Sequence, residues 1–110
     1  MFHMLSSFDL KEGESLIEFQ CDLTEFIKLL KQHDLIIECG PVGKRDQNTI
    51  LDTDDRNSRE YFMLMHFADK TQSERAVAFI YQTDPKKTYI HPQMYERATN
   101  MVFTCWEDIS

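Results

Sequence analysis

The sequence of 110 residues is short of positive charge, of cysteine and of long apolar runs, and each shortage excludes a class of function. Twelve Lys and Arg residues stand against 19 Asp and Glu residues, giving a net charge of -7, and the cations are not clustered. This balance repels phosphate backbones and anionic lipid surfaces, so we expect neither nucleic acid nor a membrane as partner. No apolar run approaches the roughly 20 residues of a membrane span, and the first residues lack the basic start of a signal peptide. We therefore expect a cytoplasmic protein.

Metal and cofactor motifs are missing as well. Zinc sites use several closely spaced ligands, whereas the three cysteines have no C-x-x-C pair among them, so we expect free thiols and no metal. The acidic cluster around Asp54 fails the calcium-loop pattern, because Asn57 stands at the glycine position and Met63 at the final glutamate position. A phosphate-binding loop, a serine nucleophile elbow, a haem motif and a dinucleotide fingerprint are all absent, so the sequence predicts no cofactor.

The most informative segment that is present runs from residue 61 to 67 and is apolar on both alternating sets of positions. As a strand it would carry Tyr61, Met63, Met65 and Phe67 on one face and Phe62, Leu64 and His66 on the other. The run 101–106 has the same character. Such strands need cover on both faces of a sheet, and the helices of this short chain suffice for one. We therefore predict a homodimer that packs through the helix-free face of the sheet.

The pattern along the chain predicts one α+β domain, residues 1–110, with the order β-α-β-β-α-β. Strands are expected over 2–10, 35–39, 61–68 and 101–106, and the second is expected to bend at Gly40-Pro41 and resume over 42–45. Residues 46–60 are expected to form a polar loop. This order is that of a ferredoxin-like fold, with a four-stranded antiparallel sheet and both main helices on one face.

Capping signals place the helices. Ser15 and Glu18 have capping-box spacing before a long amphipathic stretch that ends near 33–34, and Thr71 and Glu74 have the same spacing before a second helix. The second helix is expected to stop at Asp84-Pro85, and a short third helix is expected to start at Pro92.

Taken together, these residues resemble the dimeric α/β-barrel superfamily. The resemblance rests on 8–13 (FDLKEG) after the first strand, the long helix, the strand 61–68 followed by Asp69 and a capped helix, and Met94-Tyr95 before the last strand. The superfamily includes cofactor-independent antibiotic-biosynthesis monooxygenases, stress-responsive barrel proteins and many uncharacterised small proteins. The resemblance implies two protomers packed sheet against sheet, with an apolar cavity between each sheet and its helices. It carries no single catalytic motif.

Two polar side chains are candidate site residues. His66 interrupts an apolar strand, where it is either a general base in a cavity or a structural histidine bonded to a backbone carbonyl or to Ser6. Arg45 follows the bend at Gly40-Pro41, where it either clamps an anionic group at a cavity mouth or pairs with the acidic loop. Large adaptable side chains form either ligand-binding surface or plain core and interface, namely Tyr61, Phe62, Met63, Met65 and Trp106.

We therefore predict a homodimer that binds a small apolar or amphipathic ligand, such as a fatty-acid-like molecule, between sheet and helices. One alternative is a cofactor-independent monooxygenase or isomerase acting on an aromatic or polyketide-like substrate, with His66 as base, Tyr61 or Trp106 orienting the ring and Arg45 holding an anionic group. Another is a structural or regulatory dimer with a filled core.

Overall fold

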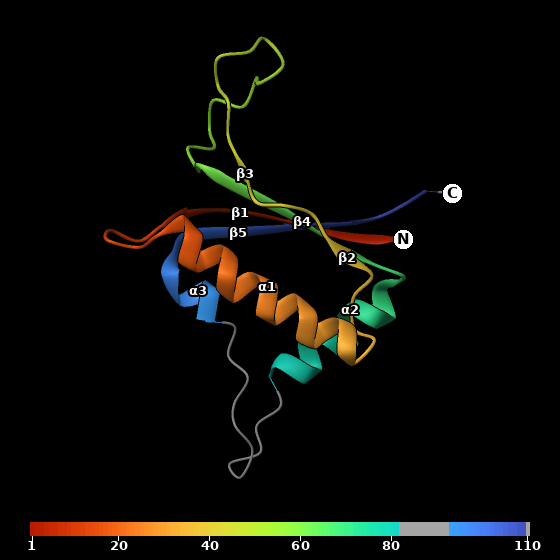
Figure 1. The fold of residues 1–110 in the computed structure, drawn as a ribbon. Helices are drawn as coiled ribbons and strands as arrows, with labels where there is room; N and C mark the ends of the chain where they lie inside the picture. Colours follow the sequence, from red (N-terminus) through yellow and green to blue (C-terminus); the bar gives the residue numbers. More distant parts are fainter. Residues whose placement is uncertain (82–92, 110) are drawn as a thin grey trace.

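The computed structural model describes residues 1–81 and 93–109, and its elements follow the predicted order (Figure 1). They are β1 (Phe2–Leu10), α1 (Leu16–Gln32), β2 (Glu38–Cys39), β3 (Gly43–Lys44), β4 (Tyr61–Phe67), α2 (Lys70–Ile80), α3 (Gln93–Arg97) and β5 (Ala98–Glu107). The α+β class is confirmed. The helix boundaries expected at Asp84-Pro85 and Pro92 lie outside the described residues.

The strands form one open antiparallel sheet in the order β2-β4-β1-β5, and β3 also pairs with β4. β2 and β3 therefore lie one after the other along the same edge of β4, with Glu38 opposite His66 and Gly43 opposite Phe62. The predicted bend at Gly40-Pro41 separates them. The strand expected over 35–39 is shorter than predicted, because Leu35 and Ile36 leave the ladder and are buried in the core.

Helices α1, α2 and α3 lie on one face of the sheet (Figure 1). The core between them joins alternate residues of β1 and β4 to the apolar stripe of α1: Phe8, Met63, Met65, Phe67, Phe19, Leu23, Phe26, Ile27 and Leu30. Fully buried Phe8 and Phe19 stack with their ring centroids 4.7 Å apart. The two alternating sets of β4 residues thus face opposite sides of the sheet, as predicted from their order in the sequence.

Polar contacts fix the helix ends. The amide of Glu18 donates to Ser15 Oγ, which confirms the predicted cap of α1. The predicted cap of α2 at Thr71 is wrong, because Asp69 has the extended backbone of a capping residue and its carboxylate accepts the amide of Gln72 at 2.7 Å. Arg97 of α3 pairs with three carboxylates, those of Glu18 and Asp22 in α1 and that of Glu14 just before the helix.

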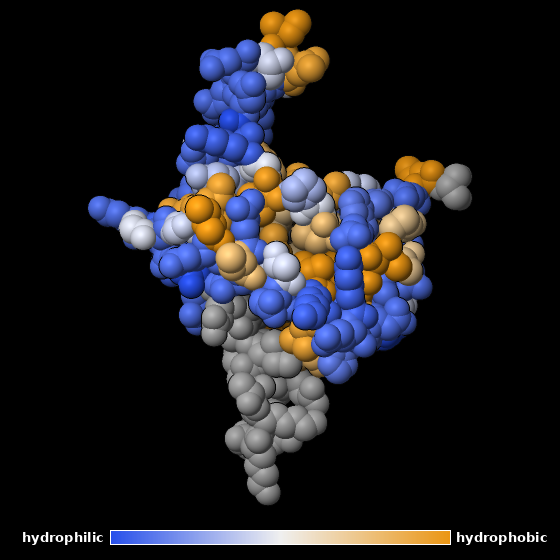
Figure 2. All heavy atoms as spheres, in the orientation of Figure 1, coloured by the Kyte–Doolittle hydropathy of each residue, from blue (hydrophilic) through white to orange (hydrophobic). Residues whose placement is uncertain are grey.

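The opposite face of the sheet carries no helix among the described residues. Residues 45–60, which we call the arm, have no helix or strand and leave the body on this side (Figure 1). Figure 2 shows that the arm is hydrophilic along its length and apolar at its end. That end consists of Ile50 and Leu51, which are 95% and 87% exposed.

Candidate functional site

The helix-free face of the sheet, which we call the open face, is built from three rows of side chains. The strand register places His66, His3 and Trp106 in the first row, Leu64, Leu5 and Thr104 in the second, and Phe62, Ser7 and Val102 in the third. Residues directly opposite on antiparallel strands share a face, so each row crosses the sheet. The open face is therefore largely apolar, with two imidazoles at one end and the arm above the other.

The two imidazoles form a hydrogen-bonded chain with a carboxylate. His66 Nδ1 lies 2.7 Å from His3 Nδ1, and His3 Nε2 lies 2.8 Å from Asp108 Oδ1. A contact between two Nδ1 atoms holds a single proton, so one ring donates and the other accepts. When a neutral His3 donates its Nε2 proton to Asp108, its Nδ1 must accept from His66. The Nε2 of His66 is then left with a free lone pair, as a general base requires.

Two neighbours complete this chain. The indole of Trp106 lies beside His3, with ring centroids 5.2 Å apart. The hydrogen bond from His3 is the main cause that lowers the pKa of Asp108, so the carboxylate is ionised at neutral pH. The bonding partner of His66 is thus another imidazole, and Ser6 lies on the opposite face of the sheet, in register with Met63.

Arg45 lies at the base of the arm and is engaged by the acidic loop. Its Nε and Nη2 donate to the two carboxylate oxygens of Asp52, each at 2.8 Å, and Nη2 also donates to the carbonyl of Asp54 at 2.6 Å. The hydrogen bonds between Arg45 and Asp52 are the main cause that lowers the pKa of Asp52 and raises that of Arg45. The side chain of Arg45 is 7% exposed, and its buried Nη1 has no hydrogen-bond partner within residues 1–81 and 93–109.

A hollow of about 810 Å³ lies between the arm and the open face. Its floor is formed by sheet residues that include Leu5, Phe62 and Val102, and its wall by arm residues that include Arg45 and Leu51.

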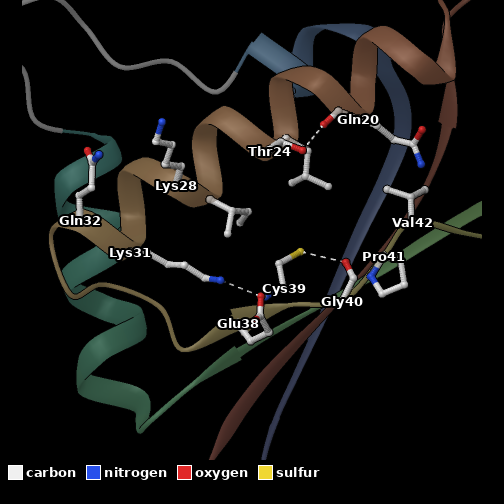
Figure 3. A pocket seen from close by; sticks show the side chains of 12 residues that line it. Gln20, Thr24, Lys28, Lys31, Gln32, Glu38, Cys39, Gly40, Pro41 and Val42 are labelled. Carbon is white, nitrogen blue, oxygen red and sulfur yellow. Dashed lines mark hydrogen bonds and ion pairs between the residues drawn. The ribbon is translucent and has the colours of Figure 1, made fainter.

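A second hollow, which we call the groove, separates α1 from β2 and has a volume of about 830 Å³ (Figure 3). Leu23, Ile27 and Val42 give it apolar walls. Across it, Lys31 Nζ donates to Glu38 Oε1 at 3.0 Å, and this hydrogen bond lowers the pKa of Glu38.

Cys39 lies on the sheet side of the groove, where its thiol donates to the carbonyl of Gly40 at 3.3 Å. Burial, followed by the charge of Glu38, raises the pKa of the Cys39 thiol to about 11.

The residues predicted for the site are distributed over three places. Arg45 and Phe62 line the hollow under the arm, and Trp106 belongs to the imidazole row with His66. The helix-facing residues lie elsewhere: Met63 and Met65 are buried in the core, and Tyr61 packs against Phe8.

Sequence reasoning missed His3, Asp108 and the groove lysine Lys31. His3 and Phe8 stand at odd and even positions of the strand expected over 2–10, so they face opposite sides of the sheet, and this alternation was an available signal for the imidazole row.

Within the described residues, no group of three or more His, Cys, Asp or Glu side chains could hold a metal ion. The helices in residues 1–81 and 93–109 are all too short or too polar to cross a bilayer.

The sequence matches no family model and no curated protein, whereas solved structures match over almost the whole chain. The crystal structure of At3g17210 from Arabidopsis thaliana has a TM-score of 0.69 at 12% identity, covering 99% of this chain and 95% of that one. A dimeric ferredoxin-like protein of unknown function from Jannaschia sp. CCS1 has a TM-score of 0.58 at 13% identity, with 97% and 98% covered. The chain has the ferredoxin-like fold.

A third neighbour has a described activity. SnoaB from Streptomyces nogalater, a cofactor-independent oxygenase, has a TM-score of 0.65 at 10% identity, covering 99% of this chain and 93% of SnoaB. Identities this low establish the shared ferredoxin-like fold alone.

Proposed function

We propose that the protein is a homodimer, joined through its open faces, that binds a small amphipathic ligand in the groove between α1 and β2. The proposal that this site binds a ligand rests on the composition of the groove, in which apolar walls lie next to the Lys31–Glu38 pair (Figure 3). Ligand sites typically combine a hydrophobic lining with a few polar groups in about 300–1,000 Å³. The groove, at about 830 Å³, has that size and chemistry.

The Lys31–Glu38 pair makes an anionic head group the best match. Both side chains are substantially exposed, so little free energy holds the pair together and a ligand carboxylate can take the place of Glu38. The alkyl chain of such a ligand would lie along Leu23, Ile27 and Val42. A fatty-acid-like molecule has both parts.

Two substitutions with opposite effects test this site. Lys31→Gln is expected to weaken the binding of dodecanoate by about tenfold, because a charge-assisted hydrogen bond is lost. Glu38→Gln is expected to strengthen it, because a competing carboxylate is removed. Isothermal titration calorimetry measures both effects, and dodecanol, which has no charge, should bind all forms alike.

Lys70→Gln is the matched control, because it removes the same charge from an exposed position of α2 that is not among the residues lining the groove. Equal effects of Lys70→Gln and Lys31→Gln would mean that net charge alone governs binding. If the protein binds neither dodecanoate nor dodecanol, the groove is not a ligand site and this proposal is wrong.

A second candidate function is general acid–base catalysis at His66, in a cofactor-independent monooxygenase or isomerase acting on an aromatic substrate. The hydrogen-bonded chain Asp108–His3–His66 favours it. A substrate proton would pass to Nε2 of His66, and the imidazolium so formed would be oriented by His3, which Asp108 holds in turn. Trp106, beside His3, offers an aromatic surface for the substrate ring.

His66→Ala is expected to lower the turnover of a polycyclic phenol by about 10²-fold to 10⁴-fold, the usual contribution of a positioned base. Asp108→Asn keeps the shape of the side chain but removes its charge, so it should lower turnover and also change the tautomers seen by NMR of the imidazole nitrogens. His33→Ala, at the exposed end of α1, is the control. Unchanged turnover in His66→Ala, with the dimer intact, would refute this role.

A further inference from the structure

The arm carries two large apolar side chains away from the body of its own protomer. Ile50 and Leu51 are 95% and 87% exposed, and Figure 2 shows an apolar end on an otherwise hydrophilic segment. Single exposed apolar residues are common, whereas an adjacent pair at the end of a projecting segment is typical of an interaction surface.

Hydrogen bonds hold the arm in one conformation although it lacks helix and strand. Asp52, held by Arg45, accepts the amide of Asp54 at 3.2 Å. Farther along, Asp54 accepts the amides of Arg56 and Asn57, at 3.0 and 3.1 Å. Such Asx contacts fix a turn without a hydrophobic core.

The base of the arm is tied to the sheet. Arg59 donates to the carbonyl of Asn100 in β5, and the amide of Glu60 donates to Asp9 of β1 at 2.9 Å. A segment ordered in this way presents its apolar end with little entropy left to lose on binding.

The arm and the open face enclose a hollow, and one of the residues lining it has a hydrogen-bond donor without an acceptor. The buried Nη1 of Arg45 has no acceptor among the described residues, and Arg45 lines this hollow. An unpartnered buried donor is costly, and because Nη1 is not exposed to the hollow, its surroundings would have to shift before an occupant could supply an acceptor.

We propose that the arm clasps the second protomer of the dimer, with Ile50 and Leu51 packed on the partner and partner atoms in the hollow. This inference rests on the proposed dimer. The arm stands on the same side as the open face, so a subunit that covers this face also meets the arm (Figure 1). Two-fold symmetry makes the contact reciprocal, since the arm of each protomer then packs on the other protomer.

The test uses the full chain with Ile50→Ser and Leu51→Ser combined. Removing two apolar side chains from an interface is expected to raise the dissociation constant of the dimer at least about tenfold in sedimentation velocity. The fold should persist, because both residues are exposed in the protomer. Ile17→Ser, an exposed residue on the helix side, is the matched control and should leave the dissociation constant unchanged.

The outcomes separate the clasp from the dimer. A wild-type protein that is monomeric at every concentration overturns both. A dimer whose dissociation constant is the same with and without the two substitutions overturns the clasp and leaves the dimer standing. A photoreactive phenylalanine at position 51 gives a second readout, which is expected to be a covalent dimer. Cross-links confined to single chains, or a small anion such as inorganic phosphate bound at Arg45 with no change in dissociation constant, would also overturn the clasp.

Discussion

Val102→Glu is expected to separate the dimer into folded monomers. Val102 lies on the open face and is 40% exposed in the protomer, so a glutamate there can remain solvated in the monomer. In the proposed dimer the same carboxylate would be buried without a partner. An unpaired buried charge costs at least about 3 kcal/mol, which corresponds to about 100-fold in the dissociation constant. Sedimentation equilibrium across micromolar concentrations measures this effect.

Val102→Thr is the control for this experiment, because threonine keeps the β-branched shape and introduces no charge. It is expected to leave most of the dimer intact. If Val102→Glu dimerises as well as the original sequence, the open face is not the interface, and both the dimer geometry and the clasp are wrong.

Phe19→Ala is expected to lower the free energy of unfolding by about 3–5 kcal/mol, the range for deleting a buried aromatic side chain. Phe19 is fully buried, and its ring stacks on Phe8 of β1 at 4.7 Å, so its removal opens a cavity between α1 and the sheet. Denaturant titration at fixed protein concentration measures the loss, since the proposed dimerisation would make stability depend on concentration.

The exposed neighbour Ile17 provides the comparison within the same helix. Ile17→Ala should change the free energy of unfolding by about 0.5 kcal/mol or less. A loss below about 1 kcal/mol for Phe19→Ala would contradict the packing of α1 on the sheet.

The order of elements was readable from the sequence because alternation and helical periodicity are local. The alternate faces of β4, the cap at Ser15 and the bend at Gly40-Pro41 all follow from neighbouring residues, and all are found in the structure. The cap of α2 was missed because two candidate caps lie within three residues, and Asp69 takes the role since its carboxylate accepts the amide of Gln72.

The candidate site was less predictable because it depends on register. Pairing His3 with His66 requires β1 and β4 to align at one offset, and a slip of one residue would place the two rings on opposite faces. Asp108 joins them from the far end of the chain. The methionines Met63 and Met65 were expected as possible ligand contacts, but the sequence does not specify how closely α1 approaches the sheet, and they are buried in the core.

The state of the Cys39 sulfur sets the chemistry of the groove. With a pKa of about 11, this sulfur is a neutral thiol at physiological pH, and the thiolate required for nucleophilic attack is scarce. A ligand bound at the proposed site would therefore meet a soft, polarisable contact instead of a reactive anion. Binding at the proposed site would then be a reversible equilibrium, because this wall offers little thiolate for a covalent bond.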